Sequence, residues 1–146
     1  MTNTQITNRI AQISKFMLEF RLAAKTKHIQ ENHVGYANFP AGSCTWASFA
    51  FGRMLKEIEP HRDWHLINAS NDDPCKNHDW LEDGELAVDI TADQYDPLEP
   101  YVGTAPPPSV KTRPRRKRIE LSTATQAYLA ALDDIRLLMN PGRKIE

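Results

Sequence analysis

The N-terminal part of the chain carries the clearest pattern of hydrophobic and polar positions. Apolar side chains recur at spacings of three and four residues, with polar or charged side chains between them. The recurring positions are Ile6, Ile10, Ile13, Met17, Phe20 and Ala24. This spacing collects the apolar side chains on one face of an α-helix. We therefore predict a single amphipathic helix from about Ile6 to Gln30 that covers the protein core.

A second helix is predicted from Cys44 to about Ile58. It follows a loop, residues 35–42, that contains two glycines and a proline, and Ser43 is a favourable N-cap residue. Pro60 ends the helical pattern. Apolar side chains occur on most sides of this helix: Trp46, Ala47, Phe49, Ala50, Phe51, Met54, Leu55 and Ile58. Because a helix that is apolar on most sides is a buried helix, the sequence places a cysteine at the start of a central element.

Residues 78–91 have the alternating pattern of a β-hairpin. Within them Asp83-Gly84 is a strong turn signal, because both residue types tolerate the positive φ angles of a type I′ turn. A turn at these two residues pairs His78 directly with Asp89. Side chains opposed in this way lie on one face of the sheet, about 4.5–5.5 Å apart at Cβ. The other face is predicted to join the core and carries Leu81, Leu86, Val88 and Ile90.

The chain, residues 1–146, is expected to form one domain. Residues 64–69 alternate weakly and predict one more strand. Residues 97–121 are rich first in proline and then in basic residues. We expect an extended connection over the proline-rich part and a solvated strand or loop edge over the basic residues 110–121, for which the functional interpretation is docking of an acidic protein substrate. A C-terminal helix is predicted over residues 122–140, where apolar residues again recur at helical spacing.

Composition narrows the class of protein. Hydrophobic residues make up 40% and charged residues 25% of the chain, as in ordinary globular proteins. The net charge of −1 argues against general attraction to nucleic acid or membranes, and no stretch approaches the ~20 apolar residues of a membrane span. The N-terminus shows no secretory signal, which favours a cytoplasmic protein with reduced thiols at Cys44 and Cys75. Delivery by a dedicated secretion system is compatible with the same sequence.

Cys44 is the candidate nucleophile. Only the thiolate is a good nucleophile, and the positive end of a helix dipole favours that form. His78 beside Asp89 is the base-and-orienter half of a catalytic triad. The alternative is that Cys44 is a small buried hydrophobic residue, the commoner fate of a lone cysteine. No group of residues has the spacing of a metal site, and no cofactor is expected.

Three motifs in this order resemble the transglutaminase-like branch of the papain-like cysteine enzymes: Gly42-Ser43-Cys44, His78-Asp79-Trp80 and Asp89-Ile90-Thr91. The resemblance covers about residues 38–95. It implies an α+β fold in which a buried helix bearing the cysteine packs on an antiparallel sheet. Helices at the N- and C-termini flank this catalytic core, residues 36–96.

The resemblance also implies roles for individual residues. Cys44 is the nucleophile, His78 is the general base and later the general acid, and Asp89 fixes the imidazole tautomer. Asn38, six residues before the cysteine, stands at the oxyanion-hole position, together with the backbone N–H of Cys44. The residues expected to contact substrate are Trp46, Trp80 and Gln94.

The implied activity is that of a cysteine-dependent hydrolase or acyltransferase on amide bonds of a protein or peptide. Proteases, glutamine deamidases and transglutaminases share the acyl-enzyme intermediate, and the sequence does not separate them. One alternative is a catalytically inactive binding module with the same fold, and another is a secreted effector or toxin with the same chemistry. A weaker alternative is a nucleic-acid binder that uses residues 113–118.

Overall fold

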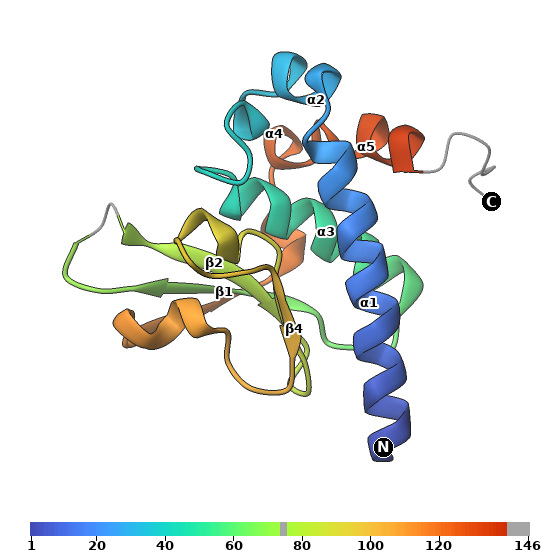
Figure 1. Ribbon diagram of the computed structural model, residues 1–146, viewed down its shortest axis with the longest axis vertical. Helices are drawn as coiled ribbons and strands as arrows, with labels where there is room; N and C mark the ends of the chain where they lie inside the picture. The colour runs from blue at the N-terminus through green and yellow to red at the C-terminus, as the bar shows by residue number, and fades with distance from the viewer. Residues whose placement is uncertain (74–75, 140–146) are drawn as a thin grey trace.

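The computed structural model describes residues 1–73 and 76–139 and has an α+β fold. Helices from both ends of the chain lie on one side of an antiparallel sheet of five strands (Figure 1). A short 3-10 helix, η4 (Pro108–Thr112), lies on the other side of the sheet. The main core lies between the sheet and the helices, and a smaller cluster under η4 contains Ile67, Ala69, Trp80 and Ala87.

The N-terminal segment forms two helices, α1 (Asn3–Ala24) and α2 (Lys27–Asn32). The prediction of one continuous helix was therefore wrong at its C-terminal end. Thr26 is the N-cap of α2: its hydroxyl donates to the Ala23 carbonyl and accepts from the Ile29 amide. A threonine that bonds to nearby backbone groups in this way competes with the helical hydrogen bonds, and the chain turns here.

The central helix α3 (Cys44–Ile58) begins and ends as predicted. Its buried residues include Ala47, Phe51 and Leu55, which are fully enclosed. Gly52 of α3 faces the sheet, where a Cβ atom would lie 2.9 Å from the Leu81 side chain and 2.8 Å from that of Leu121. The glycine thus allows the helix to approach the sheet closely.

The sheet has the strand order β4-β3-β2-β1-β5, with every neighbouring pair antiparallel. The strands are β1 (His65–Ser70), β2 (His78–Glu82), β3 (Ala87–Asp89), β4 (Tyr101–Gly103) and β5 (Arg115–Ile119). The basic part of segment 97–121 forms the solvated edge strand β5, in agreement with the expected strand or loop edge, whereas the proline-rich part, expected to have little regular structure, supplies β4 and η4. Short edge strands with basic or polar residues protect a sheet against pairing with other chains.

The hairpin between β2 and β3 differs from the prediction in its register. Leu81 pairs with Val88, two residues further along than expected. The Asp83 side chain accepts hydrogen bonds from the amides of Glu85 and Leu86, at 2.9 and 2.7 Å. Asp83 is thus the residue before the turn and caps it through its side chain. Gly84, with φ of 91°, is the first residue of the turn itself. Because the offset is an even number of residues, the predicted faces are preserved.

The C-terminal segment was expected to form one helix and is instead divided. It consists of η5 (Leu121–Thr123), α4 (Gln126–Leu129) and α5 (Leu132–Met139). Tyr128 packs on Trp46 and Phe49 of α3, with ring centroids 4.8 and 5.1 Å apart. Leu132 and Ile135 are buried where α5 packs against α1. A turn between α4 and α5 directs these apolar side chains to two different helices.

Arg9 of α1 fixes the hairpin to the helical layer. Its guanidinium forms ion pairs with Glu59 at the end of α3 and with Asp83 and Glu85 of the β2–β3 turn, at 2.7–2.8 Å. The Arg9 side chain is 10% exposed, and that of Asp83 is fully buried. Burial lowers the pKa of Arg9, but its hydrogen bonds to Glu59 and Asp83 outweigh burial and raise it above the usual value.

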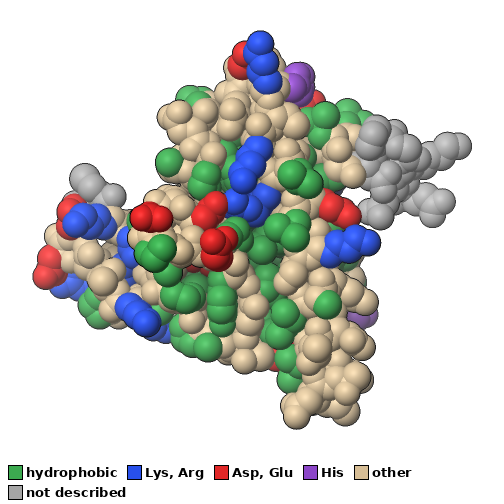
Figure 2. All heavy atoms as spheres, viewed as in Figure 1, with side chains coloured by type: hydrophobic (Ala, Val, Ile, Leu, Met, Phe, Trp, Pro, Cys, Tyr) green, Lys and Arg blue, Asp and Glu red, His purple; other side chains and the backbone are tan. Residues whose placement is uncertain are grey.

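The basic residues of β5 lie at the surface, as expected. Arg115 pairs with Asp72, and Arg118 pairs with Asp63 and Glu120. Figure 2 shows basic and acidic side chains interspersed on one face of the molecule rather than collected in a single charged patch. Among residues 1–73 and 76–139, no helix is long and apolar enough to cross a membrane.

Candidate active site

Cys44 is the first residue of α3 and is partly exposed. Ser43 precedes it, but the Ser43 hydroxyl makes no capping hydrogen bond to the helix. It donates instead to the Gly35 carbonyl at 2.7 Å. The N–H groups of the first turn are therefore left without a side-chain cap from Ser43.

His78 and Asp89 are in direct contact. The imidazole Nε2 lies 2.9 Å from each of the two carboxylate oxygens, and both side chains are fully buried. In the observed register these two residues are diagonal rather than opposite, since extending the Leu81–Val88 pairing places Thr91 across from His78. Diagonal neighbours share a face and lie close enough for a long side chain to bridge them.

The environment of His78 favours its protonated form. Burial lowers the pKa of the imidazole, but hydrogen bonds to Asp89 and to Cys44, together with the charges of these groups, raise it to about 9. Nε2 is bonded to Asp89, and the other imidazole nitrogen, Nδ1, lies 3.1 Å from the Gln94 amide nitrogen. An imidazolium next to a thiol stabilises the thiolate.

The free energy of unfolding is expected to fall as the pH rises from about 6.5 to about 9. Unfolded His78 releases its proton near pH 6.5, whereas folded His78 keeps it up to a pKa of about 9, so folding takes up a proton in this window. This contribution to stability is complete below the window and lost above it. Urea unfolding at several pH values measures the slope, and His78→Gln is the control, in which the slope should disappear. Equal slopes in both proteins would contradict the raised pKa.

Gln94 lies at the free nitrogen of the imidazole. It ends the 3-10 helix η3 (Ala92–Gln94), and its amide nitrogen lies 3.1 Å from both His78 Nδ1 and the Thr91 hydroxyl. When Nδ1 is unprotonated, the Gln94 amide nitrogen donates a hydrogen bond to it. When Nδ1 is protonated, rotation of the Gln94 amide by 180° places its oxygen there as the acceptor. Gln94, expected to contact substrate, is thus partly exposed beside the reacting atoms.

Arg21 of α1 holds the segment that carries Asp89 and Gln94, and the sequence analysis missed it. Its guanidinium donates to the Ile90 carbonyl at 2.6 Å and forms a two-point ion pair with Asp93. It also lies 5.2 Å from the centroid of the Phe39 ring. A signal was present: Arg21 falls four residues after Met17 and three before Ala24, on the buried face of its helix.

Asp79 fixes the start of α3 to the sheet. It lies between His78 and Trp80 but points to the helical side, where its carboxylate accepts hydrogen bonds from Thr45 and Asn68. The Asn68 amide donates at 2.6 Å, and the Asp79 side chain is almost completely buried. Since Thr45 follows Cys44, these contacts set the position of the cysteine relative to His78.

The remaining predicted site residues lie in different surroundings. Trp80 is fully buried, and its indole N–H donates to Glu82, so it has no exposed surface to offer a substrate. It packs near the imidazole, with ring centroids 6.0 Å apart, and shields His78 from water. Trp46 is partly exposed and lines a cavity of about 240 Å³ beside η1 (Val34–Tyr36). Asn38 is exposed, and in the described part of the chain no contact joins it to Cys44.

No group of three or more histidine, cysteine or acidic residues within 1–73 and 76–139 is arranged to hold a metal ion. Cys75 lies outside the described residues.

Tyr95 completes the surroundings of His78, with its ring edge against the imidazole at a centroid distance of 5.0 Å. Burial raises the pKa of the Tyr95 hydroxyl, and the charge of Arg113 opposes this shift.

The site has the geometry of a thiol with a buried base and a carboxylate that orients the base. Comparison of the whole chain with models of known protein families, with curated proteins and with solved structures finds no significant match.

Proposed function

We propose that the protein is a cysteine-dependent hydrolase or acyltransferase that acts on amide bonds of a protein or peptide. The observation that carries this proposal is the buried contact of His78 Nε2 with the carboxylate of Asp89, together with the raised pKa of His78, to which Asp89 and the partly exposed Cys44 contribute. The same arrangement supports assignment to the transglutaminase-like branch of the papain-like enzymes.

The first half of the reaction forms a thioester. The Cys44 thiolate attacks the carbonyl carbon of the substrate amide, and the carbonyl oxygen takes up negative charge. We assign the Cys44 backbone N–H as one donor to that oxygen and the Gln94 amide, which lies beside His78 Nδ1, as the side-chain donor in place of the exposed Asn38. The protonated His78 then gives its Nδ1 proton to the leaving nitrogen, which departs as an amine or as ammonia.

The second half releases the acyl group. His78, now neutral, accepts a proton from an attacking water or amine, and the thioester breaks to restore the thiol. Water produces hydrolysis or deamidation, and a primary amine produces a cross-link. Asp89 stabilises the imidazolium each time it forms and remains ionised throughout.

Cys44 is expected to react with iodoacetamide at pH 7 about tenfold faster than the same residue in the urea-unfolded chain. An ordinary thiol is only a few per cent thiolate at this pH, and an imidazolium beside a thiol, the arrangement we propose for His78 and Cys44, makes such a thiol more reactive. Peptide mass spectrometry at timed intervals measures the rate at each cysteine separately.

The control is His78→Gln, which keeps the thiol and removes the cation. Its Cys44 should react at the rate of an ordinary exposed thiol. A folded wild-type protein in which Cys44 and Cys75 react equally fast would argue against an activated nucleophile. That result would favour the interpretation of the fold as a binding module.

A further inference from the structure

We propose that Ser109 and Arg113, on the segment between β4 and β5, are positioning residues of the Cys44–His78–Asp89 centre. Ser109 acts on Asp89, and Arg113 holds both Ser109 and Tyr95 in place. This inference rests on the proposed function, since it assigns parts of the same site. It gives a role to residues 108–113, which by composition belong to a proline-rich and basic connection.

Ser109 supplies the second hydrogen bond to the carboxylate of Asp89. Its hydroxyl donates to Oδ2 at 2.6 Å, while His78 Nε2 lies 2.9 Å from both oxygens. All three side chains are buried, and Ser109 is only 4% exposed. A buried carboxylate needs donors to stay ionised, and a donor on one oxygen also prevents rotation of the carboxylate about its own axis. The Ser109 hydroxyl thus fixes the orientation of the Asp89 carboxylate relative to the His78 imidazole.

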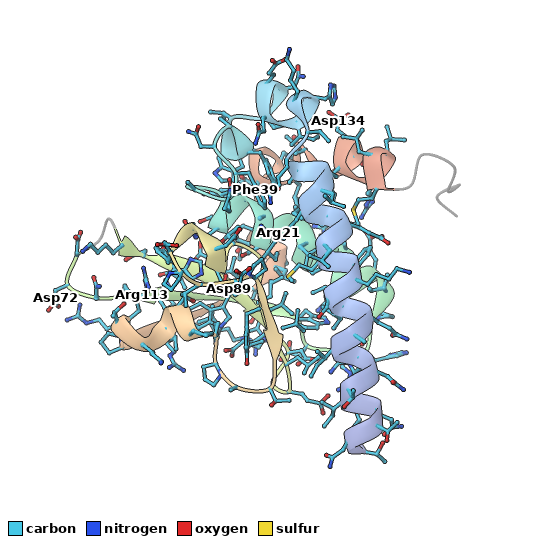
Figure 3. All side chains as sticks on the ribbon, in the orientation of Figure 1. Arg21, Phe39, Asp72, Asp89, Arg113 and Asp134 are labelled. Atoms are coloured by element: carbon cyan, nitrogen blue, oxygen red, sulfur yellow. The ribbon has the colours of Figure 1, made fainter. Side chains whose placement is uncertain are left out.

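Arg113 holds the backbone of Ser109. Its Nη1 donates to the Ser109 carbonyl at 2.6 Å, and its Nε donates to the Lys76 carbonyl at 2.6 Å. Arg113 is 5% exposed although it belongs to the basic run that was expected to be solvated. Because Lys76 lies two residues before His78, the guanidinium joins the strand of the base to the segment that contacts Asp89. Figure 3 labels Arg113 and Asp89, which both lie beside the sheet.

Arg113 also supports the other wall of the imidazole pocket. Its guanidinium carbon lies 4.4 Å from the centroid of the Tyr95 ring, and that ring meets the His78 ring edge-on at 84°. Planar stacking of a guanidinium on an aromatic ring is favourable and needs no carboxylate partner. Among the described residues, the charged or titratable groups facing His78 are Asp89 of β3, Cys44 of α3 and Tyr95 after η3, with Arg113 behind Tyr95.

A purely structural role for this segment is already supplied by a different residue. Val110, between the two positioning residues, packs on the apolar cluster of Ile67, Ala69, Trp80 and Ala87. Replacing Ser109 with alanine leaves that packing unchanged and removes only the donor to Asp89. The effect of Ser109 on the site is therefore separable from the attachment of the segment to the sheet.

The test is a comparison of Ser109→Ala with wild type by NMR titration of the His78 imidazole and by the alkylation rate of Cys44. The His78 signal is identified by its absence from the spectrum of His78→Gln. In Ser109→Ala the midpoint of the His78 titration should fall by about one pH unit, because the carboxylate is less firmly oriented and ionised. The rate of Cys44 alkylation at pH 7 should fall about tenfold.

Two further variants separate the hydroxyl from other changes. Ser109→Thr keeps a hydroxyl and should restore the wild-type midpoint. Arg113→Lys lacks the separate Nε and Nη1 donors of the planar guanidinium and should shift the midpoint in the same direction as Ser109→Ala. Ser48→Ala is the matched control, since Ser48 is equally buried but bonds only weakly to the Asp79 carbonyl, at 3.4 Å. It should leave the midpoint unchanged.

An unchanged His78 midpoint in Ser109→Ala overturns the proposal, as does a lowered midpoint that Ser109→Thr does not restore. If Ser109→Ala does not fold, Arg113→Lys decides in its place: a midpoint equal to that of wild type overturns the proposal. The titration needs no catalysis. A wild-type Cys44 of ordinary reactivity would refute the proposed function, while the His78 midpoints would still report on Ser109.

Discussion

Replacing Cys44 with alanine is expected to abolish every covalent change that the wild-type protein makes in the proteins of a cell lysate. Removal of the nucleophile from a thioester mechanism costs a factor of about 10⁴ or more in rate. The measurement is a comparison of lysates incubated with the two proteins by mass spectrometry. New peptide ends indicate proteolysis, mass shifts at glutamine indicate deamidation, and linked peptides indicate transamidation.

Cys75→Ala is the matched control for this experiment. It removes the second cysteine of the chain and should leave the modification of the lysate unchanged. Modifications that persist in Cys44→Ala but disappear in Cys75→Ala would contradict the assignment of the nucleophile. A lysate that wild type leaves unaltered would instead indicate a binding module or a substrate that is absent from that lysate, and a lysate from a different class of cell distinguishes these two.

Replacing Arg9 with methionine is expected to lower the free energy of unfolding by about 3 kcal/mol, a large part of the ~5–15 kcal/mol of a typical domain. The substitution keeps most of the side-chain volume but leaves the buried carboxylate of Asp83 without its ion pair. Glu59 and Glu85 lose the same partner. Urea unfolding followed by circular dichroism measures the change.

Arg118→Met is the matched control, because Arg118 also pairs with two carboxylates but does so in solvent. Exposed ion pairs contribute little, so this variant should unfold close to wild type. The double variant Arg9→Met with Asp83→Asn should recover part of the loss, since it no longer contains an unpaired buried charge. Similar losses in Arg9→Met and Arg118→Met would show that the hairpin attachment does not depend on burial.

The predicted contact between His78 and Asp89 is present although the predicted turn was wrong. The hairpin signal at Asp83-Gly84 identified the right pair of residues but not their roles, because Asp83 caps the turn through its side chain. The resulting offset is two residues, and side chains in a strand alternate with a period of two. The alternation of side chains along the strands therefore predicted correctly which face each residue occupies. The turn motif did not predict correctly which residues pair across the hairpin.

Buried arginines were the main omission in the helical layer. The sequence analysis did not single out Arg9 or Arg21, yet both are buried residues of α1. Their spacing relative to Ile13 and Met17 is that of core positions. Their carboxylate partners come from the end of α3, the β2–β3 turn and η3, which are fifty or more residues away in sequence. Helical periodicity can indicate that such an arginine is buried, but only the tertiary structure shows what it binds.

The segment 97–121 was the least predictable part of the chain. Prolines and charges conceal the short strands β4 and β5, since three to five residues of an edge strand carry little apolar pattern. Ser109 has no local signal at all, because its importance depends on the position of Asp89, twenty residues earlier. Arg113 is separated from the basic run that follows it by Pro114, which was a weak indication that its surroundings differ.

The contacts of Arg113 have a consequence for the order in which the protein is made. Ribosomes produce a chain from its N-terminus, so Cys44 emerges well before Ser109 and Arg113 have been added. An unfinished chain, or a fragment cut before residue 109, contains the thiol, the imidazole and the carboxylate but lacks the segment that encloses them. We expect such a nascent chain to carry an ordinary, slowly reacting cysteine. An activated cysteine would then arise only after residue 113 has been added to the chain.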